Sequence, residues 1–246
     1  MAQLLQNHFP NSTAEIHTYK GYALAEDTKP FSIQEEIAAV QDFLLQCHKH
    51  KQKKEDLVLI GHSLGCYLAK EALQKKKIPI KYFFCIFPFW KREQGSAFQN
   101  RIKSALNNSL LSEVVLKSHG FFKQKPFVEN FLRHFVFKHA MNQKSIEITN
   151  RYFLEADHIV KNLFFLAQTE FDEIPFELDK DFLVEFKSQL RIYFTNNDEW
   201  APTTQLEELK ELDSKLYCDY IANVGHDFCV RDFGNSKLFE KISLGM

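Results

Sequence analysis

The stretch LVLIGHSLGCYLAK, residues 57–70, most constrains what this chain can fold into. A continuous apolar run leads into Gly-His-Ser-Leu-Gly, and an apolar helical pattern follows at once, although the whole sequence holds only 8 glycines. Gly-x-Ser-x-Gly between a buried strand and a helix is typical of the nucleophile elbow, whose serine has a strained backbone. Side chains at Gly61 and Gly65 would collide with the helix and the neighbouring strand, so these glycines make room for the turn. We therefore predict that Ser63 is a nucleophile.

The segments around the elbow alternate between strand and helix patterns. Alternating β-branched and aromatic residues predict a strand at 14–20, and Ser32 with Glu35 forms a capping box that predicts the start of a helix. The apolar run at 56–61 predicts a central parallel strand covered on both faces. A helix over 63–77 and a buried strand in IKYFFCIFPF follow. This alternation indicates an α/β fold.

The middle third of the chain has a different pattern. Residues 91–188 show helical periodicity and few strand signals, whereas QLRIYFTNND, TTQLEELKELDS and KLYCDYIANVGHDF restore the alternation. We therefore predict a mostly parallel sheet with helices on both faces, formed by residues 1–90 and 189–246. Residues 91–188 are predicted to form a helical cap inserted into this core.

A nucleophilic serine needs a base and an acid that orients the base, and in elbow-bearing folds the chain order is serine, acid, histidine. His226 follows the last predicted strand in NVGHDF and is the predicted base. Asp198 lies just beyond a predicted strand in IYFTNNDEWAP and is the predicted acid. Glu199 is the first alternative for the acid, and Asp172 and Asp213 are more distant ones.

We also make predictions for the backbone N–H of Leu64 and for the side chain of His62, both in the elbow. The backbone N–H of Leu64 lies at a helix N-terminus and is predicted to face a developing oxyanion. His62 stands inside the elbow, and we expect its side chain to point away from the nucleophile.

The composition excludes several classes of protein. The formal net charge of −1 gives no global field that points to nucleic acid. The longest apolar run, 82–90, is too short to span a bilayer, and the N-terminal residues lack the pattern of a secretion signal. The 5 cysteines are odd in number and form no CxxC pair, which indicates free thiols in a reducing compartment. We therefore expect a cytoplasmic protein.

Three segments together resemble the lipid-droplet-associated serine hydrolases of the α/β-hydrolase superfamily. They are the elbow segment, the acid loop TNNDEWAP with Asp198, Trp200 and Pro202, and NVGHDF with His226 followed one residue later by Phe228. FFCIFPF also resembles the family's strand after the elbow. The resemblance implies an α/β-hydrolase fold whose cap follows the sixth strand. It also implies hydrolysis of a lipid-like acyl or sterol ester by the predicted serine, acid and histidine, with neither a metal nor an organic cofactor.

One part of the family's pattern is not found in the printed sequence. The family has an upstream strand ending in a Pro-Gly-Asn-Pro-Gly type of loop, which supplies the second backbone donor of the oxyanion hole. Loss of one such donor lowers the rate by about 10²–10³. Two expectations follow: a truncated start of the chain, or a catalytically weak lipid-binding or lipid-surface protein that keeps the hydrolase fold. An acyltransferase with the same three residues is a further alternative.

The cap also carries a prediction about partners. Residues 91–150 hold ten Lys and Arg against four Glu, and residues 119–140 mix Phe with Lys and Arg as interfacial amphipathic helices do. One hypothesis is that the cap docks on an anionic lipid surface, such as a droplet or a membrane, and admits an apolar acyl group. The alternative is a cap whose apolar residues face its own core and whose basic face is solvated.

Overall fold

A parallel β-sheet forms the centre of the molecule. The computed structural model describes residues 6, 10–22, 29–50, 55–108, 113, 143–231 and 234–245. Within these residues the sheet has the strand order β1-β2-β3-β4, formed by Val58–His62, Tyr82–Ile86, Leu190–Phe194 and Cys218–Tyr220. Each neighbouring pair is parallel, so the carboxyl ends of the strands lie along one edge. The predicted α/β class is therefore confirmed.

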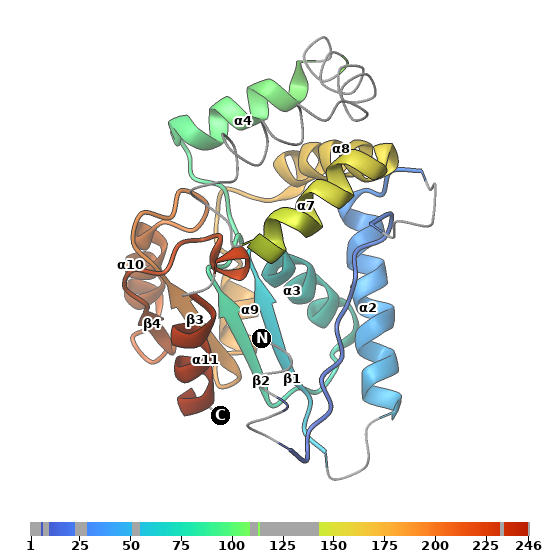
Figure 1. Cartoon of the computed structure of the whole chain (residues 1–246). Helices are drawn as coiled ribbons and strands as arrows, with labels where there is room; N and C mark the ends of the chain where they lie inside the picture. The colour runs from blue at the N-terminus through green and yellow to red at the C-terminus, as the bar shows by residue number, and fades with distance from the viewer. Residues whose placement is uncertain are drawn as a thin grey trace.

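Helices cover both faces of the sheet. The core helices are α2 (Ile33–His50), α3 (Leu64–Lys76), α9 (Lys180–Glu185), α10 (Thr203–Leu212) and α11 (Gly234–Gly245), with a 3-10 turn η2 (Phe228–Val230). In Figure 1, α11 lies in front of the sheet, and α3 and α9 lie behind it. The predicted capping box forms at α2: the Ser32 N–H donates to Glu35 Oε2 over 2.9 Å, and the Glu35 N–H donates to Ser32 Oγ over 3.3 Å. Local sequence therefore fixes where this helix starts.

The strands are apolar because both faces of the sheet are packed. Phe83 and Phe84 of β2 and Tyr193 of β3 are fully buried. Burying a side chain of this size stabilises the fold by about 1.5–3 kcal/mol. The two middle strands are thus a rigid frame for the loops at their carboxyl edge.

The chain between β2 and β3 is mostly helical where it is described. Besides α9, its helices in the described part are α4 (Ala97–Asn107), α7 (Gln143–Glu155) and α8 (Asp157–Glu173). They lie above the carboxyl edge of the sheet, and α8 packs against α2, α4 and α7 (Figure 1). The basic, Phe-rich stretch 119–140 lies outside the described residues. The division into a core of 1–90 and 189–246 and a cap of 91–188 stays a prediction.

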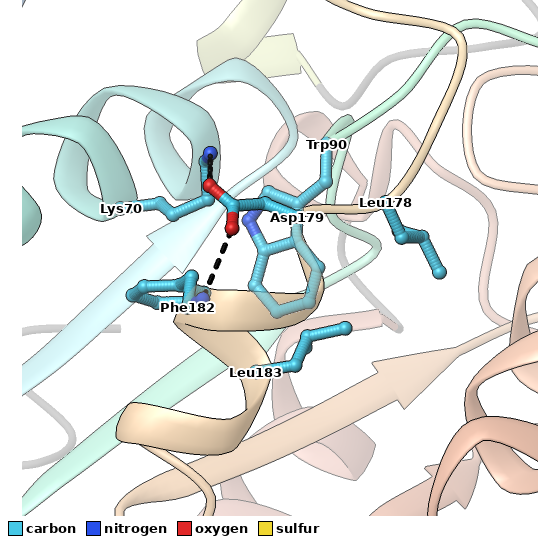
Figure 2. A pocket seen from close by; sticks show the side chains of 6 residues that line it. All are labelled: Lys70, Trp90, Leu178, Asp179, Phe182 and Leu183. Atoms are coloured by element: carbon cyan, nitrogen blue, oxygen red, sulfur yellow. Dashed lines mark hydrogen bonds and ion pairs between the residues drawn. The ribbon is translucent and has the colours of Figure 1, made fainter.

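The two ends of this insertion meet on α3. Lys70 of α3 is buried and its ammonium lies 3.0 Å from the Asp179 carboxylate, which also accepts the Phe182 N–H over 3.0 Å (Figure 2). The Trp90 and Phe182 rings pack edge to face with centroids 5.9 Å apart. Trp90 precedes the insertion and Asp179 lies near its end, so this cluster joins both ends to the helix that follows the elbow.

Two strand predictions differ from the structure. Residues 14–20 form no strand, and Ile16 is 72% exposed, because the described residues supply no ladder partner for them. β1 was expected to be central, yet it is the outermost strand of the described sheet, and Ile60 is 37% exposed. A central strand needs a neighbour on each side, and within the described ranges β1 pairs with β2 alone.

The structure also bears on the expectations about membrane-spanning helices and about the cysteines. Every helix in the described part is too short or too polar to pass through a lipid bilayer. All five cysteines lie in the described ranges as free thiols, with Cys66 and Cys85 buried.

Candidate active site

Ser63 occupies a strained turn between β1 and α3. Its backbone has φ 53° and ψ −123°, a positive-φ conformation that is rare for a residue with a side chain. The Ser63 N–H donates to the Ile86 carbonyl over 3.1 Å, and the Ser63 carbonyl accepts the N–H groups of Cys66 over 3.0 Å and Phe89 over 3.2 Å. β2 and the loop after it therefore hold the turn on one side, and α3 holds it on the other.

The two elbow glycines have different surroundings. A Cβ at Gly61 would lie 3.1 Å from backbone atoms of Cys66 and 3.1 Å from the Phe83 ring, so the expected collision with the helix and the neighbouring strand is real there. At Gly65 the nearest described atom is Tyr19 Oη at 3.7 Å, an ordinary contact distance. The expected collision at Gly65 is thus absent among the described residues, because this side of α3 is only partly covered.

Ser63, His226 and Asp198 lie in one hydrogen-bonded chain. His226 Nε2 is 2.8 Å from Ser63 Oγ, and His226 Nδ1 is 2.7 Å from Asp198 Oδ2. The other Asp198 oxygen accepts the N–H groups of Trp200 over 2.9 Å and Ala201 over 3.0 Å. The Asp198 side chain is fully buried, whereas that of His226 is 20% exposed. The predicted serine, base and acid therefore meet at the carboxyl edge of the sheet.

The alternative acids lie elsewhere. The Glu199 side chain is exposed, and its backbone carbonyl accepts a hydrogen bond from Gln99 over 3.0 Å. Asp172 pairs with Lys103 at 3.7 Å. Asp213 pairs with Lys187, which lowers the pKa of this carboxyl. The carboxylate that contacts the His226 ring is that of Asp198.

Two residues that the sequence did not single out join the acid loop to the histidine loop. Thr195 is fully buried, and its hydroxyl donates to the Ile221 carbonyl over 2.8 Å and also contacts the Val224 carbonyl. Asn196 Oδ1 accepts the Asn223 N–H over 3.0 Å. Both precede Asp198 in TNND, a stretch that resembles an ordinary turn, so the sequence signals only a loop.

His62 lies beside the base. Its ring centroid is 4.9 Å from that of His226, 4.8 Å from that of Phe228 and 6.3 Å from that of Phe87. Burial lowers the pKa of His62 to about 4, so the imidazole is neutral near pH 7. The expectation that His62 points away from the nucleophile did not anticipate this packing against the His226 ring.

An aromatic wall extends from the base into the insertion. The Trp200 ring lies 6.5 Å from His226, 5.2 Å from Phe89, 5.1 Å from Phe98 of α4 and 6.1 Å from Phe171 of α8, measured between centroids. Residues of the core and of the insertion thus form one aromatic cluster next to the reactive groups, in which Phe89 and Phe171 are almost fully buried. Its partly exposed rings, Trp200 and Phe98, suit a hydrocarbon chain better than a charged ligand.

The N-terminus of α3 contributes a positive electrostatic potential beside Ser63. Leu64 is the first residue of α3, so its N–H belongs to the helix end where backbone donors have no intrahelical partner and partial positive charge accumulates. Among the described residues, no His, Cys, Asp and Glu side chains gather closely enough to hold a metal ion.

Comparison with known proteins places this geometry in a family. The family model described as lipid-droplet associated hydrolase matches residues 3–229. The mouse (Mus musculus) lipid droplet-associated hydrolase is 25% identical over 168 residues, which are 66% of this chain and 49% of the mouse protein. The chain therefore spans about half the length of this curated relative.

Solved structures share the fold at low sequence identity. An esterase from Exiguobacterium antarcticum superposes with a TM-score of 0.61 at 13% identity, covering 98% of this chain and 85% of its own. The α/β hydrolase MGS-M2 from a deep-sea metagenome library gives a TM-score of 0.56 at 16% identity, covering 88% and 72%. Such likenesses show that the chain has the α/β-hydrolase fold.

Proposed function

Because this chain belongs to the lipid-droplet-associated hydrolase family, we propose that it is a serine hydrolase of lipid-like carboxylic esters. The observation that carries the proposal is the hydrogen-bonded chain from Ser63 Oγ through His226 to the buried Asp198. This arrangement has the order and the distances of an activated serine nucleophile.

In the proposed acylation step, Ser63 Oγ attacks the ester carbonyl carbon while His226 Nε2 takes the hydroxyl proton. The carbonyl π electrons move onto oxygen, and the Leu64 N–H stabilises this oxyanion. The tetrahedral intermediate then collapses: the bond to the alcohol breaks, and the imidazolium returns the proton to the departing alkoxide. Asp198 holds the Nδ1–H tautomer and stabilises the imidazolium, while the hydrogen bonds that it accepts from the Trp200 and Ala201 N–H groups hold it in place.

In deacylation the same steps take place with water as the nucleophile. His226 Nε2 removes a proton from water, the hydroxide adds to the acyl carbon of the Ser63 ester, and the imidazolium protonates Ser63 Oγ as the carboxylic acid leaves. The products are an alcohol and a carboxylic acid, and the free serine is restored. An acyltransferase would differ in this step alone, with an alcohol in place of water.

The aromatic wall supports an apolar acyl group as the substrate. Trp200 packs against His226 on one side and against Phe98 of α4 and Phe171 of α8 on the other, and a hydrocarbon chain bound to Ser63 would contact the partly exposed Trp200 and Phe98 rings. The mouse relative is named a lipid droplet-associated hydrolase, which supports association with a lipid-droplet surface. We include association with such a surface in the proposal; liposome flotation with and without anionic lipid tests it, and binding to neither would contradict it.

The test of the hydrolase proposal is the substitution Ser63→Ala. We expect kcat for a medium-chain nitrophenyl ester to fall by as much as about 10⁶, and labelling by a fluorophosphonate probe to disappear. Ser188→Ala is the matched control, because Ser188 is an exposed serine just before β3 and its loss should change neither readout. Equal labelling of the wild type and Ser63→Ala would contradict the proposal. A wild type that the probe does not label but that binds fatty acyl ligands would favour the lipid-binding alternative.

A further inference from the structure

Phe87 has a strained backbone directly after β2. Its φ of 47° lies in a region that residues with a side chain rarely adopt, and it precedes Pro88, whose ring normally restricts the residue before it to extended backbone. Such a conformation persists only where the surroundings enforce it. The Phe87 N–H donates to the Tyr193 carbonyl of β3 over 2.9 Å, and the Phe87 side chain has no exposed surface. The fold therefore holds this ring in one place at a cost in stability.

The Phe87 ring packs on the catalytic base. Its centroid lies 6.2 Å from that of the His226 ring with the planes tilted by 37°, and 5.7 Å from that of the Phe228 ring with the planes at 89°. Both separations fall in the range of favourable aromatic pairs. The His62 and Trp200 rings also lie beside His226, at 4.9 Å and 6.5 Å, but both residues are partly exposed. Among the described rings that pack on His226, the fully buried one is thus that of Phe87.

The same short segment also holds the nucleophile. The Ile86 carbonyl accepts the Ser63 N–H over 3.1 Å, and the Phe89 N–H donates to the Ser63 carbonyl over 3.2 Å. Phe87 lies between Ile86 and Phe89 in the chain, so the segment is tied to the backbone of Ser63 on both sides of the strained residue. The ring of Phe87 therefore relates the position of the base to that of the nucleophile, whose Oγ lies 2.8 Å from His226 Nε2.

We propose that Phe87 is a positioning residue for His226: its strained backbone directs the ring against the imidazole and limits the rotation that would separate His226 Nε2 from Ser63 Oγ. This inference rests on the proposed hydrolase function. The ring carries no polar atom, so it acts on the geometry of the base and not by proton transfer. A displacement of the base by about 1 Å can cost about 10² in rate, so the loss of this ring has a measurable effect.

The experiment compares Phe87→Leu with Phe84→Leu. Phe84 of β2 is equally buried, and its ring stacks on that of Tyr193 with centroids 6.4 Å apart. The two variants thus remove the same ring from fully buried positions, but only Phe87→Leu removes it from the base. At a temperature where circular dichroism shows both folded, we expect kcat on a medium-chain nitrophenyl ester to fall by about 10–10² in Phe87→Leu, with KM changed by less than about threefold. Phe84→Leu is expected to keep kcat within about threefold of the wild type.

A further substitution keeps the test decisive if Phe87→Leu does not fold. Phe87→Met places a flexible apolar chain in the same space, and such a chain adapts to gaps in a core without giving the imidazole a flat surface. We expect kcat to fall by about fivefold or more in Phe87→Met, again with KM changed by less than about threefold.

A second measurement does not require turnover. The Nδ1–H proton between His226 and Asp198, whose Nδ1 and Oδ2 atoms lie 2.7 Å apart, should give a low-field NMR signal, which is assigned by its absence from His226→Gln. A mobile imidazole exposes this proton to exchange with water. We therefore expect the signal to lose about half of its intensity or more in Phe87→Leu and Phe87→Met, and to persist in Phe84→Leu.

The outcomes separate this inference from the proposed function. Equal kcat in Phe87→Leu and Phe84→Leu, or an unchanged signal in Phe87→Leu, would show that Phe87 only fills the core and would overturn the positioning role. A wild type without the low-field signal would overturn it as well, since there would be no ordered imidazole to hold. A wild type that matches Ser63→Ala in turnover and labelling would overturn the hydrolase proposal instead. In that case the NMR signal alone decides whether Phe87 positions His226.

Discussion

Two regions of this molecule bury polar groups in different ways. At the active site, Asp198 is fully buried but accepts two backbone N–H bonds and a third bond from His226. At the contact between α2 and α8, burial raises the pKa of Glu36 to about 7 and that of Glu170 to about 8. The site carboxylate is therefore held in place by matched donors, whereas the carboxyls between core and insertion change charge near neutral pH. The position of Asp198 is therefore fixed, whereas the charge of the carboxyls at the contact between α2 and α8 depends on pH.

The contact between α2 and α8 also contains hydrogen bonds that join side chains of α8 to the backbone around the start of α2. Asn162 of α8 is almost fully buried; its Oδ1 accepts the Phe31 N–H over 2.6 Å, and its amide donates to the Lys20 carbonyl over 3.0 Å. Thr169 Oγ1 accepts the Ile33 N–H over 3.0 Å. Backbone groups before and at the start of α2 thus find partners on the insertion, which makes docking of α8 dependent on a few polar side chains.

The largest effect is expected for a substitution in the active site. In Asp198→Asn the amide can still accept the two backbone N–H bonds, but it favours the wrong tautomer of His226. We expect kcat for ester hydrolysis to fall by about 10⁴ with little change in the melting temperature. Steady-state kinetics and thermal unfolding measure both. Asp181→Asn, an exposed aspartate on α9, is the control and should behave as the wild type. A loss of less than tenfold in Asp198→Asn would refute the role of this carboxylate.

The next largest effect is expected for a substitution that weakens the contact between the insertion and the core. Asn162→Ala leaves the partly buried Phe31 N–H and the Lys20 carbonyl without the Asn162 side chain as their partner, which should cost about 1–3 kcal/mol of unfolding free energy. Urea denaturation monitored by circular dichroism measures this. Asn100→Ala on the exposed face of α4 is the matched control, with an expected change below about 0.5 kcal/mol. Equal stability of the two variants would show that Asn162 does not attach α8.

A smaller effect is expected at Trp200, whose ring packs against His226 of the active site and against Phe98 and Phe171 of the insertion. Trp200→Ala removes the ring between His226 and the insertion, so a long acyl chain loses contacts that a short one never makes. We expect kcat/KM for a dodecanoyl ester to fall by about 10–100-fold and that for an acetyl ester by less than about threefold. Trp200→Phe should lose less on the long chain than Trp200→Ala does. Equal losses on both esters would contradict an acyl-binding wall.

The smallest effect depends on pH. Burial raises the pKa of Glu170 to about 8, whereas an unfolded Glu ionises near pH 4.5. The unfolded state therefore releases its proton first, and the stability that the protonated native Glu170 contributes is lost as pH rises from about 5 to 8. Glu170→Gln stays neutral, so its unfolding free energy relative to the wild type should rise by on the order of 2 kcal/mol between pH 5 and pH 8. Melting curves at the two pH values test this.

The control for the pH experiment is Glu177→Gln, an exposed residue whose substitution should shift both melting curves equally. A constant difference between Glu170→Gln and the wild type across this pH range would show that Glu170 ionises as readily in the folded protein as in the unfolded one.

Features with a strong local signal could be predicted from the sequence. The capping box at Ser32 and Glu35 fixes the start of α2 by bonds within four residues. Continuous apolar runs predicted β1 and β2, and the return of the strand and helix alternation predicted β3. Ser63, Asp198 and His226 could be proposed because each follows a strand, and parallel strands end at one edge.

Features that depend on a distant partner could not be predicted. Residues 14–20 alternate like a strand, but an alternating pattern forms a strand only beside a neighbour. Gly65 appeared to need its small size as Gly61 does, yet the space at each is set by what packs against it. The bonds of Thr195 to residues 26 and 29 positions later in the chain leave no trace in a turn-like TNND.

The sequence by itself determined the elbow, the order of strands and helices around it, and the family to which the chain belongs, because apolar periodicity, glycine spacing and short motifs act over a few residues. Only the tertiary structure decided which carboxylate meets His226, that the His62 ring packs on the base, and that the buried Asn162 amide attaches α8 to the segments before α2. The physical reason is that hydrogen bonds and ring contacts require positions within a few ångströms, and folding brings together groups that are more than a hundred residues apart in the chain.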